Sequence, residues 1–238
     1  MAEQRAPARR TAKGGLAESS SKAELEQFLA EARNLAPAGE GRGRLIFALD
    51  ATMSRQPTWD AAQRLQSEMF TEAAKVGQLE IQLVYYRGFN ECRASKWVAD
   101  GAALGRLMTA IEVRGGNTQI GRVLAHARSE NAKGKVGALV FVGDALEEPV
   151  DRLAALAGEL GMLGVKAFVF QEGTDATVER AFREIARLSG GAYARFDVHA
   201  PGQLAALLRA AAAYAAGGVK ALAKAGGGEG RLLLEQLR

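Results

Sequence analysis

The stretch LIFALDATMS (45–54) decides the fold. It begins with five uninterrupted apolar residues, as expected for a strand buried on both faces of a parallel sheet. The run ends in Asp50, and Thr52 and Ser54 follow at alternate positions. In doubly wound sheets, ligands bind beyond the carboxyl ends of the strands, where the strand order reverses. The stretch therefore predicts both a central strand and three oxygen-bearing side chains at the ligand-binding edge.

The rest of the chain alternates between strand-like and helix-like patterns. We expect further parallel strands at 79–88, 138–143, 165–172 and 192–197, and helices at 59–76, 100–110, 119–131, 151–163, 175–188 and from about 203. Segment 91–98 follows its predecessor so closely that only a hairpin fits, which predicts an antiparallel edge strand. The alternation predicts an α/β fold: a doubly wound, mostly parallel six-stranded sheet with one antiparallel edge strand and helices on both faces.

Four regions are expected along the chain. Residues 1–20 lack apolar periodicity, and residues 1–15 carry +3 of the net charge of +4, so a disordered basic tail is expected over 1–20. SKAE at 21–24 is a capping box that begins an N-terminal helix over 21–36. The main domain covers 42–216. Residues 217–238 hold the end of a helix, a Gly-rich linker and the apolar tail RLLLEQLR, which either folds back onto the domain or docks on a partner.

Composition limits the location and the classes of partner. The single cysteine, Cys92, excludes an internal disulfide bond and fits a reducing compartment. No run of about 18 apolar residues is present, so no membrane-spanning segment is expected. The basic charge lies mainly in the N-terminal tail, and we do not expect nucleic acid as a partner. A cytoplasmic protein is the expectation.

Two further segments carry oxygen ligands in comparable positions. RGGNTQIG (114–121) contains Thr118 in a glycine-flanked loop before a helix, and ALVFVGDALEE (138–148) contains Asp144 directly after an apolar strand. With Asp50, Thr52 and Ser54, the set has two carboxylates and three hydroxyls but no His or Cys, which favours Mg²⁺ (or Mn²⁺) over zinc. Neutral hydroxyl ligands leave such an ion poorly neutralised. It would therefore accept a further carboxylate from outside.

These three segments together resemble the von Willebrand factor A (vWA) domain of the bacterial intracellular type. Their pattern is similar to its metal-ion-dependent adhesion site, Asp-x-Ser-x-Ser followed by a distant Thr and a distant Asp. Asp50, Thr52, Ser54, Thr118 and Asp144 occupy those places, and Thr52 departs from the usual Ser. The resemblance implies that the hydroxyls bind the ion directly and that the carboxylates act largely through water.

The resemblance further implies a non-enzymatic protein-interaction module. A partner protein would offer an Asp or Glu to the metal, and by analogy an AAA+ ATPase is a possible partner. Two alternatives stay open: a metal-assisted hydrolase of phosphate esters, and a structural module with a vestigial metal site. Locally, Thr118 is also a candidate N-cap of the helix that follows it. Glu147 and Glu148 are either a solvated loop or a negative rim of the site.

Overall fold

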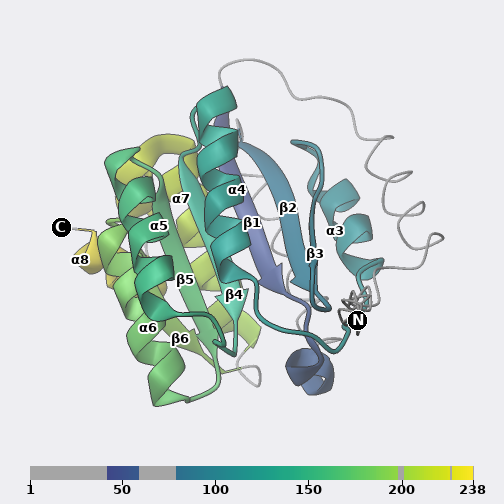
Figure 1. The fold of residues 1–238 in the computed structure, drawn as a ribbon. Coiled ribbons are helices and arrows are strands. Elements are labelled where there is room, and N and C mark those ends of the chain that lie inside the picture. Colours follow the sequence, from purple (N-terminus) through teal and green to yellow (C-terminus); the bar gives the residue numbers. More distant parts are fainter. Residues whose placement is uncertain (1–41, 59–78, 198–200, 226, 238) are drawn as a thin grey trace, which may run out of the picture.

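A six-stranded sheet lies between two layers of helices (Figure 1). The computed structural model describes residues 42–58, 79–197, 201–225 and 227–237. The strands are β1 (Gly43–Asp50), β2 (Leu79–Arg87), β3 (Glu91–Ala94), β4 (Ala138–Gly143), β5 (Lys166–Glu172) and β6 (Ala192–Phe196). The helices are η1 (Met53–Thr58), α3 (Gly101–Thr109), α4 (Ile120–Lys133), α5 (Val150–Met162), α6 (Ala176–Leu188), α7 (Pro201–Ala225) and α8 (Gly227–Gln236).

The predicted fold class is confirmed. The expected basic tail, the N-terminal helix at 21–36 and the helix at 59–76 lie outside the described residues. The strand order is β3-β2-β1-β4-β5-β6, and β3 pairs antiparallel with β2 while the other pairings are parallel. The chain therefore starts in the middle of the sheet, builds outward through β2 and β3, and returns to β4 on the other side of β1. The reversal lies between β1 and β4, so their carboxyl ends meet at the expected ligand-binding edge.

The apolar run of β1 divides its side chains between two cores. Leu45, Phe47 and Leu49 belong to the core beneath α3 and α7, whereas Ile46 and Ala48 belong to the core beneath α4, α5 and α6. All five side chains are buried. Alternate residues of a strand point to opposite faces, so a strand covered on both sides must be apolar at every position. Figure 1 shows these two helical layers on either side of the sheet.

The C-terminal segment differs from the expected linker and follows the fold-back alternative. Residues 227–236 form helix α8, although glycine is a weak helix former. Leu233 is fully buried in the core beneath α7, and Leu234 and Leu237 pack partly against it. Burial of these leucines against the domain outweighs the poor helical propensity of the glycines, which is why the flexible linker predicted from composition is wrong.

Helix α8 also covers the outer edge of the sheet. Strand β6 is an edge strand, so one side of its backbone has no neighbouring strand. The amide side chain of Gln236 takes that place: its Oε1 accepts the N–H of Tyr193 at 2.8 Å, and its Nε2 donates to the carbonyl of Tyr193 at 2.9 Å. One side chain thus satisfies both backbone groups that a further strand would pair with.

Candidate metal centre

Asp50 is fixed in place at the end of β1. Its side chain is fully buried, and both carboxylate oxygens accept hydrogen bonds. Oδ1 accepts the backbone N–H of Thr52 at 2.7 Å, and Oδ2 accepts the hydroxyl of Tyr86 at 2.9 Å. Tyr86 is the residue of β2 that stands opposite Asp50 in the parallel register. This phenol is a part of the site that the sequence analysis missed.

The hydroxyls of Thr52 and Ser54 lie next to each other. Thr52 Oγ1 and Ser54 Oγ are 3.1 Å apart, so the alternate spacing brings both hydroxyls to one side of the loop, as expected. Thr52 is buried, whereas Ser54 is exposed. The pair therefore connects the buried carboxylate of Asp50 with solvent.

The loop that carries Thr118 lies against the ends of both β1 and β2. The N–H of Arg114 donates to the carbonyl of Ala51 at 3.0 Å, and the N–H of Asn117 donates to the carbonyl of Gly88 at 3.2 Å. A Cβ atom at Gly116 would lie 2.0 Å from that same carbonyl oxygen. Only glycine permits this close approach of two backbones, in agreement with the role expected for the glycines before Thr118.

Thr118 is joined to the loop that follows Asp144. Its N–H donates to the Glu147 carboxylate at 2.9 Å, and its Oγ1 accepts the N–H of Glu147 at 3.0 Å. The suggestion that Thr118 caps helix α4 is wrong, because the N-cap position is Gln119 and it makes no side-chain cap bond. The carboxylate of Glu148 accepts the N–H groups of Ile120 and Gly121 instead.

Glu147 and Glu148 therefore clamp the two loops together. Glu147 is exposed, as the solvated-loop alternative expects, and it also accepts the N–H of Thr118, whereas the half-buried Glu148 accepts the N–H of Gly121. Glu148 lies at the positive end of a helix, where a carboxylate is favourable. Even so, its pKa is raised, because burial outweighs the N–H groups of Gly121 and Ile120.

Asp144 carries an unsatisfied buried oxygen. Its Oδ1 is inaccessible to solvent, and none of the described residues forms a hydrogen bond with it. Burial raises the pKa of Asp144 above its ordinary value, and this outweighs the opposing effects of the Ser54 hydroxyl and the Arg55 guanidinium. A buried acceptor without a donor is costly and calls for a missing partner such as an ion.

Asp50 and Asp144 face the same site. Burial is the main cause that raises the pKa of Asp50, and the negative charge of Asp144 adds to it. A side chain at Gly143, directly before Asp144, would place its Cβ 3.6 Å from the Cβ of Asp50. The reversal of strand order between β1 and β4 thus brings the two carboxylates together, as the sequence analysis predicts.

Arg55 is a second feature that the sequence analysis missed. Its side chain is fully buried. It donates to the Glu172 carboxylate through Nε at 3.0 Å and Nη2 at 2.7 Å, and to the carbonyl of Asp50 through Nη1 at 3.3 Å. The guanidinium links the loop after β1 to the end of β5. It also places a positive charge beside Asp144.

Four of the five predicted ligands form one continuous group, namely Asp50, Thr52, Ser54 and Asp144. The fifth, Thr118, reaches this group through the loop of Asp144. Within the described residues, no three His, Cys, Asp or Glu side chains are grouped so that they could hold a metal ion. A metal centre here would therefore depend on its hydroxyls, which is the donor set expected for a hard cation.

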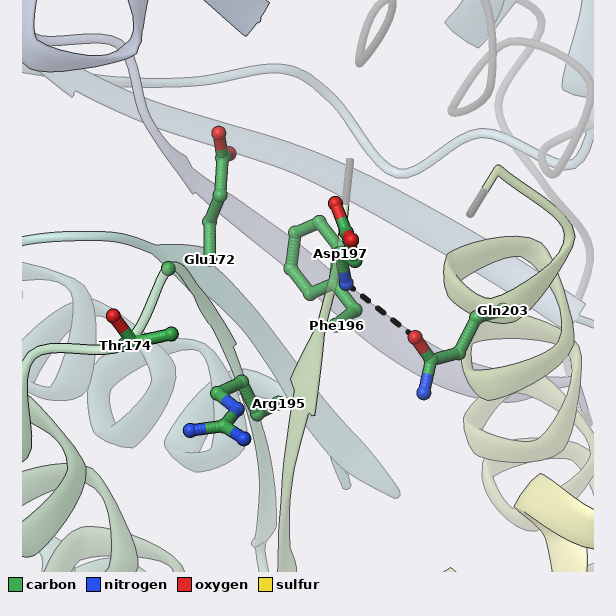
Figure 2. A pocket seen from close by; sticks show the side chains of 7 residues that line it. Glu172, Thr174, Arg195, Phe196, Asp197 and Gln203 are labelled. Carbon is green, nitrogen blue, oxygen red and sulfur yellow. Dashed lines mark hydrogen bonds between the residues drawn. The ribbon is translucent and has the colours of Figure 1, made fainter. Parts of the chain in front are cut away.

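A pocket of about 510 Å³, lined mainly by polar residues, lies next to this group, at the carboxyl ends of β5 and β6. Its lining comprises Glu172, Gly173, Thr174, Arg195, Phe196, Asp197 and Gln203. Figure 2 shows the Arg195 guanidinium extending away from the carboxylates of Glu172 and Asp197, and the N–H of Asp197 donating to Gln203. Glu172 connects the pocket with the candidate metal centre, because it is the partner of Arg55.

None of the helices among the described residues combines the length and apolar character that a membrane-spanning segment requires. No protein-family model and no curated protein matches the sequence. Solved structures do match it, at low sequence identity.

The VWA domain of SpRpn10 is 13% identical with a TM-score of 0.57, over 69% of this chain and 95% of that domain. A von Willebrand factor type A protein from Catenulispora acidiphila is 18% identical with a TM-score of 0.58, over 74% of this chain and 43% of that one. Proximal thread matrix protein 1 from the mussel byssus, with a zinc-occupied metal-ion-dependent adhesion site, is 14% identical with a TM-score of 0.60, over 72% of this chain and 46% of that one. The chain therefore has the fold of the von Willebrand factor A domains.

Proposed function

We propose that this chain is a protein-interaction module that binds its partner through a divalent cation. Asp50, Thr52, Ser54, Thr118 and Asp144 would hold Mg²⁺ or Mn²⁺. The bound ion would supply a positive charge that accepts an Asp or Glu carboxylate of a partner protein. The observation that carries the proposal is the buried Oδ1 of Asp144, for which the described part of the chain supplies no hydrogen-bond partner, together with the paired hydroxyls of Thr52 and Ser54.

The charge of the site supports a divalent ion. The carboxylates of Asp50, Asp144 and Glu172 and the guanidinium of Arg55 act on one another. Three negative groups and one positive group leave a net charge of −2 when the carboxylates are ionised. An uncompensated negative charge is unfavourable in a partly buried site, and a divalent cation neutralises it.

The residues that hold the candidate ligands in place have distinct roles in this proposal. Asp50 is held by the Thr52 N–H and the Tyr86 hydroxyl, so it is oriented before any ion arrives. Glu147 keeps Thr118 beside the loop of Asp144. A site whose donors are already fixed loses less conformational entropy on binding. The likeness to a thread matrix protein with a zinc-occupied adhesion site is consistent with a cation at this position.

Calorimetric titration of the full chain with MgCl₂ and MnCl₂ tests the metal site. We expect binding that Asp144→Ala and Thr118→Val abolish. The matched control is Thr109→Val, on the exposed end of α3, which should bind as the unsubstituted chain does. Absence of binding heat at millimolar metal would refute the proposal.

We also propose a cytoplasmic location, which the single cysteine supports, and an AAA+ ATPase as a partner by analogy. Co-purification with unsubstituted and Asp50→Ala bait, compared by mass spectrometry, tests the partner. An AAA+ protein captured equally by both baits would contradict a metal-dependent contact. Hydrolysis of p-nitrophenyl phosphate with Mg²⁺, which we do not expect, would instead support the hydrolase.

A further inference from the structure

Three exposed apolar side chains lie in loops around the candidate metal centre. Met53 stands between Thr52 and Ser54 and is 52% exposed, Phe89 is 56% exposed, and Val150 is 39% exposed. Met53 follows β1, Phe89 follows β2, and Val150 begins α5 after β4. These are the carboxyl ends of the three strands at and beside the reversal point.

Their loops are tied to the segment of Thr118. The carbonyl of Gly88, directly before Phe89, accepts the N–H of Asn117. The loop before Val150 is clamped to the same segment by Glu147 and Glu148. The three side chains therefore belong to segments that all contact residues 114–121, the first through the N–H of Arg114 and the carbonyl of Ala51. The other large exposed apolar side chains of the described residues are Met162, Leu163, Val219 and Leu232, which belong to the end of α5, the turn after it, α7 and α8.

The turn that carries Phe89 is held rigidly on both sides of the ring. On one side, the carbonyl of Gly88 also accepts Nε2 of Gln119 at 3.1 Å. On the other, Arg122 donates to the carbonyl of Asn90 at 2.8 Å and to its side chain at 3.0 Å. An aromatic ring that is exposed but presented on a fixed backbone loses little conformational entropy when a partner covers it. Such side chains dominate the binding energy of protein interfaces.

We infer that Met53, Phe89 and Val150 form an apolar collar around the metal centre, and that the partner is a protein segment whose acidic residue is flanked by apolar side chains. This inference rests on the proposed function, since the carboxylate would bind the cation while its neighbours pack on the collar. The positive charge of the bound cation complements the negative charge of the partner's carboxylate. The apolar surface around the cation excludes water, which strengthens the attraction between the cation and the carboxylate. The polar pocket beyond β5 lies outside the collar.

The test is a selection on the full chain from a displayed library of cyclic 12-residue peptides, each with one central Asp and random flanking residues. Peptides are bound in MgCl₂ and eluted with EDTA. We expect Leu, Met and Phe to be enriched beside the Asp. Phe89→Ser should weaken a selected peptide about tenfold without changing the affinity for Mg²⁺ alone. The matched control is Met162→Ser, at an 83% exposed position at the end of α5, and it should change neither affinity.

The outcomes separate this inference from the proposed function. If Mg²⁺ binds but EDTA elutes peptides with polar flanks, or elutes none, the collar is refuted and the metal site stands. If Phe89→Ser and Val150→Ser both leave peptide affinity unchanged, the collar is likewise refuted. If Mg²⁺ alone does not bind the full chain, both proposals fail together.

Discussion

Asp144→Asn is expected to stabilise the metal-free protein while abolishing metal binding. No donor among the described residues reaches the buried Oδ1 of Asp144, and burial raises the pKa of this carboxyl. The ionised form of this carboxyl is therefore disfavoured at its place in the fold. An unsatisfied buried polar atom costs about 1–3 kcal/mol, and more if charged. Asn removes the charge but keeps the shape, so we expect a gain of about 1 kcal/mol. That gain corresponds to roughly 2–4 °C in the melting temperature of a chain of this size.

Metal should reverse this order of stability. A ligand at a hundred times its Kd stabilises the native state by about 2.7 kcal/mol, or roughly 5–10 °C here. The unsubstituted chain should therefore melt below Asp144→Asn in EDTA and above it in saturating MgCl₂. Differential scanning calorimetry in the two buffers measures both differences.

The stability difference between Asp144→Asn and the unsubstituted chain should depend on pH, and the direction of this dependence follows from the raised pKa of Asp144. A carboxyl whose pKa is raised in the folded state favours folding when it is protonated, and this contribution is lost as pH rises through the folded-state pKa. The advantage of Asn in EDTA should therefore grow as pH rises above the ordinary range of an Asp and fade as pH falls toward that range.

Asp175 is the matched control for this titration, because hydrogen bonds from the N–H groups of Val178 and Thr177 lower its pKa. Asp175→Asn should give no stabilisation at pH 7. If Asp144→Asn is less stable than the unsubstituted chain in EDTA at pH 7, or binds Mg²⁺ equally well, the reasoning about the orphaned oxygen is wrong.

Three further substitutions test other parts of the structure. Thr52→Ser should retain Mg²⁺ binding in calorimetry and Thr52→Val should lose it, because Ser keeps the hydroxyl that lies beside Ser54 and Val does not. If Thr52→Val binds Mg²⁺ as well as the unsubstituted chain does, Thr52 is not a ligand. Arg55→Met leaves a buried carboxylate and a carbonyl without their donor and should cost about 3 kcal/mol or more in urea unfolding. Arg187→Met, which breaks an exposed pair on α6, should show no measurable change, and equal effects would contradict the buried role of Arg55. Leu233→Ala should lower the free energy of unfolding by about 2–5 kcal/mol, because Leu233 is fully buried. Leu232→Ala, at a 46% exposed position, should lower it by little. Similar melting temperatures for the two variants would show that α8 is not docked as described.

The parts of the fold that depend on local pattern could be predicted from the sequence. The uninterrupted apolar run of 45–49 indicated a strand buried on both faces, and the short connection before 91–98 indicated an antiparallel edge. Asp50 and Asp144 were expected to meet because each ends a strand that could lie at the reversal, and β1 and β4 are neighbours in the sheet. That inference needed only chain order and the rule for ligand positions in doubly wound sheets.

Contacts that depend on the register between strands could not be predicted from the sequence. Tyr86 reaches Asp50 because the parallel pairing sets them opposite each other, and a shift of one residue would send the phenol to the other face. Arg55 and Glu172 are 117 residues apart, and no periodicity relates them. A phenol at the end of a buried strand was the one available signal, since a buried Tyr hydroxyl usually needs a partner. Helix α8 was missed because tertiary packing overrides the low helical propensity of glycine.

The position of Gln236 near the end of the chain has a consequence for synthesis and for proteolysis of the protein. Gln236 leaves the ribosome 43 residues after Tyr193, so the outer side of β6 is open while the segment between them is synthesised. An open strand edge is a template for pairing with a neighbouring chain, and nascent polypeptides on one messenger RNA are close neighbours. A protease that removes α8 would recreate the same hazard in the mature molecule. Clipped samples should therefore form oligomers before they lose their secondary structure.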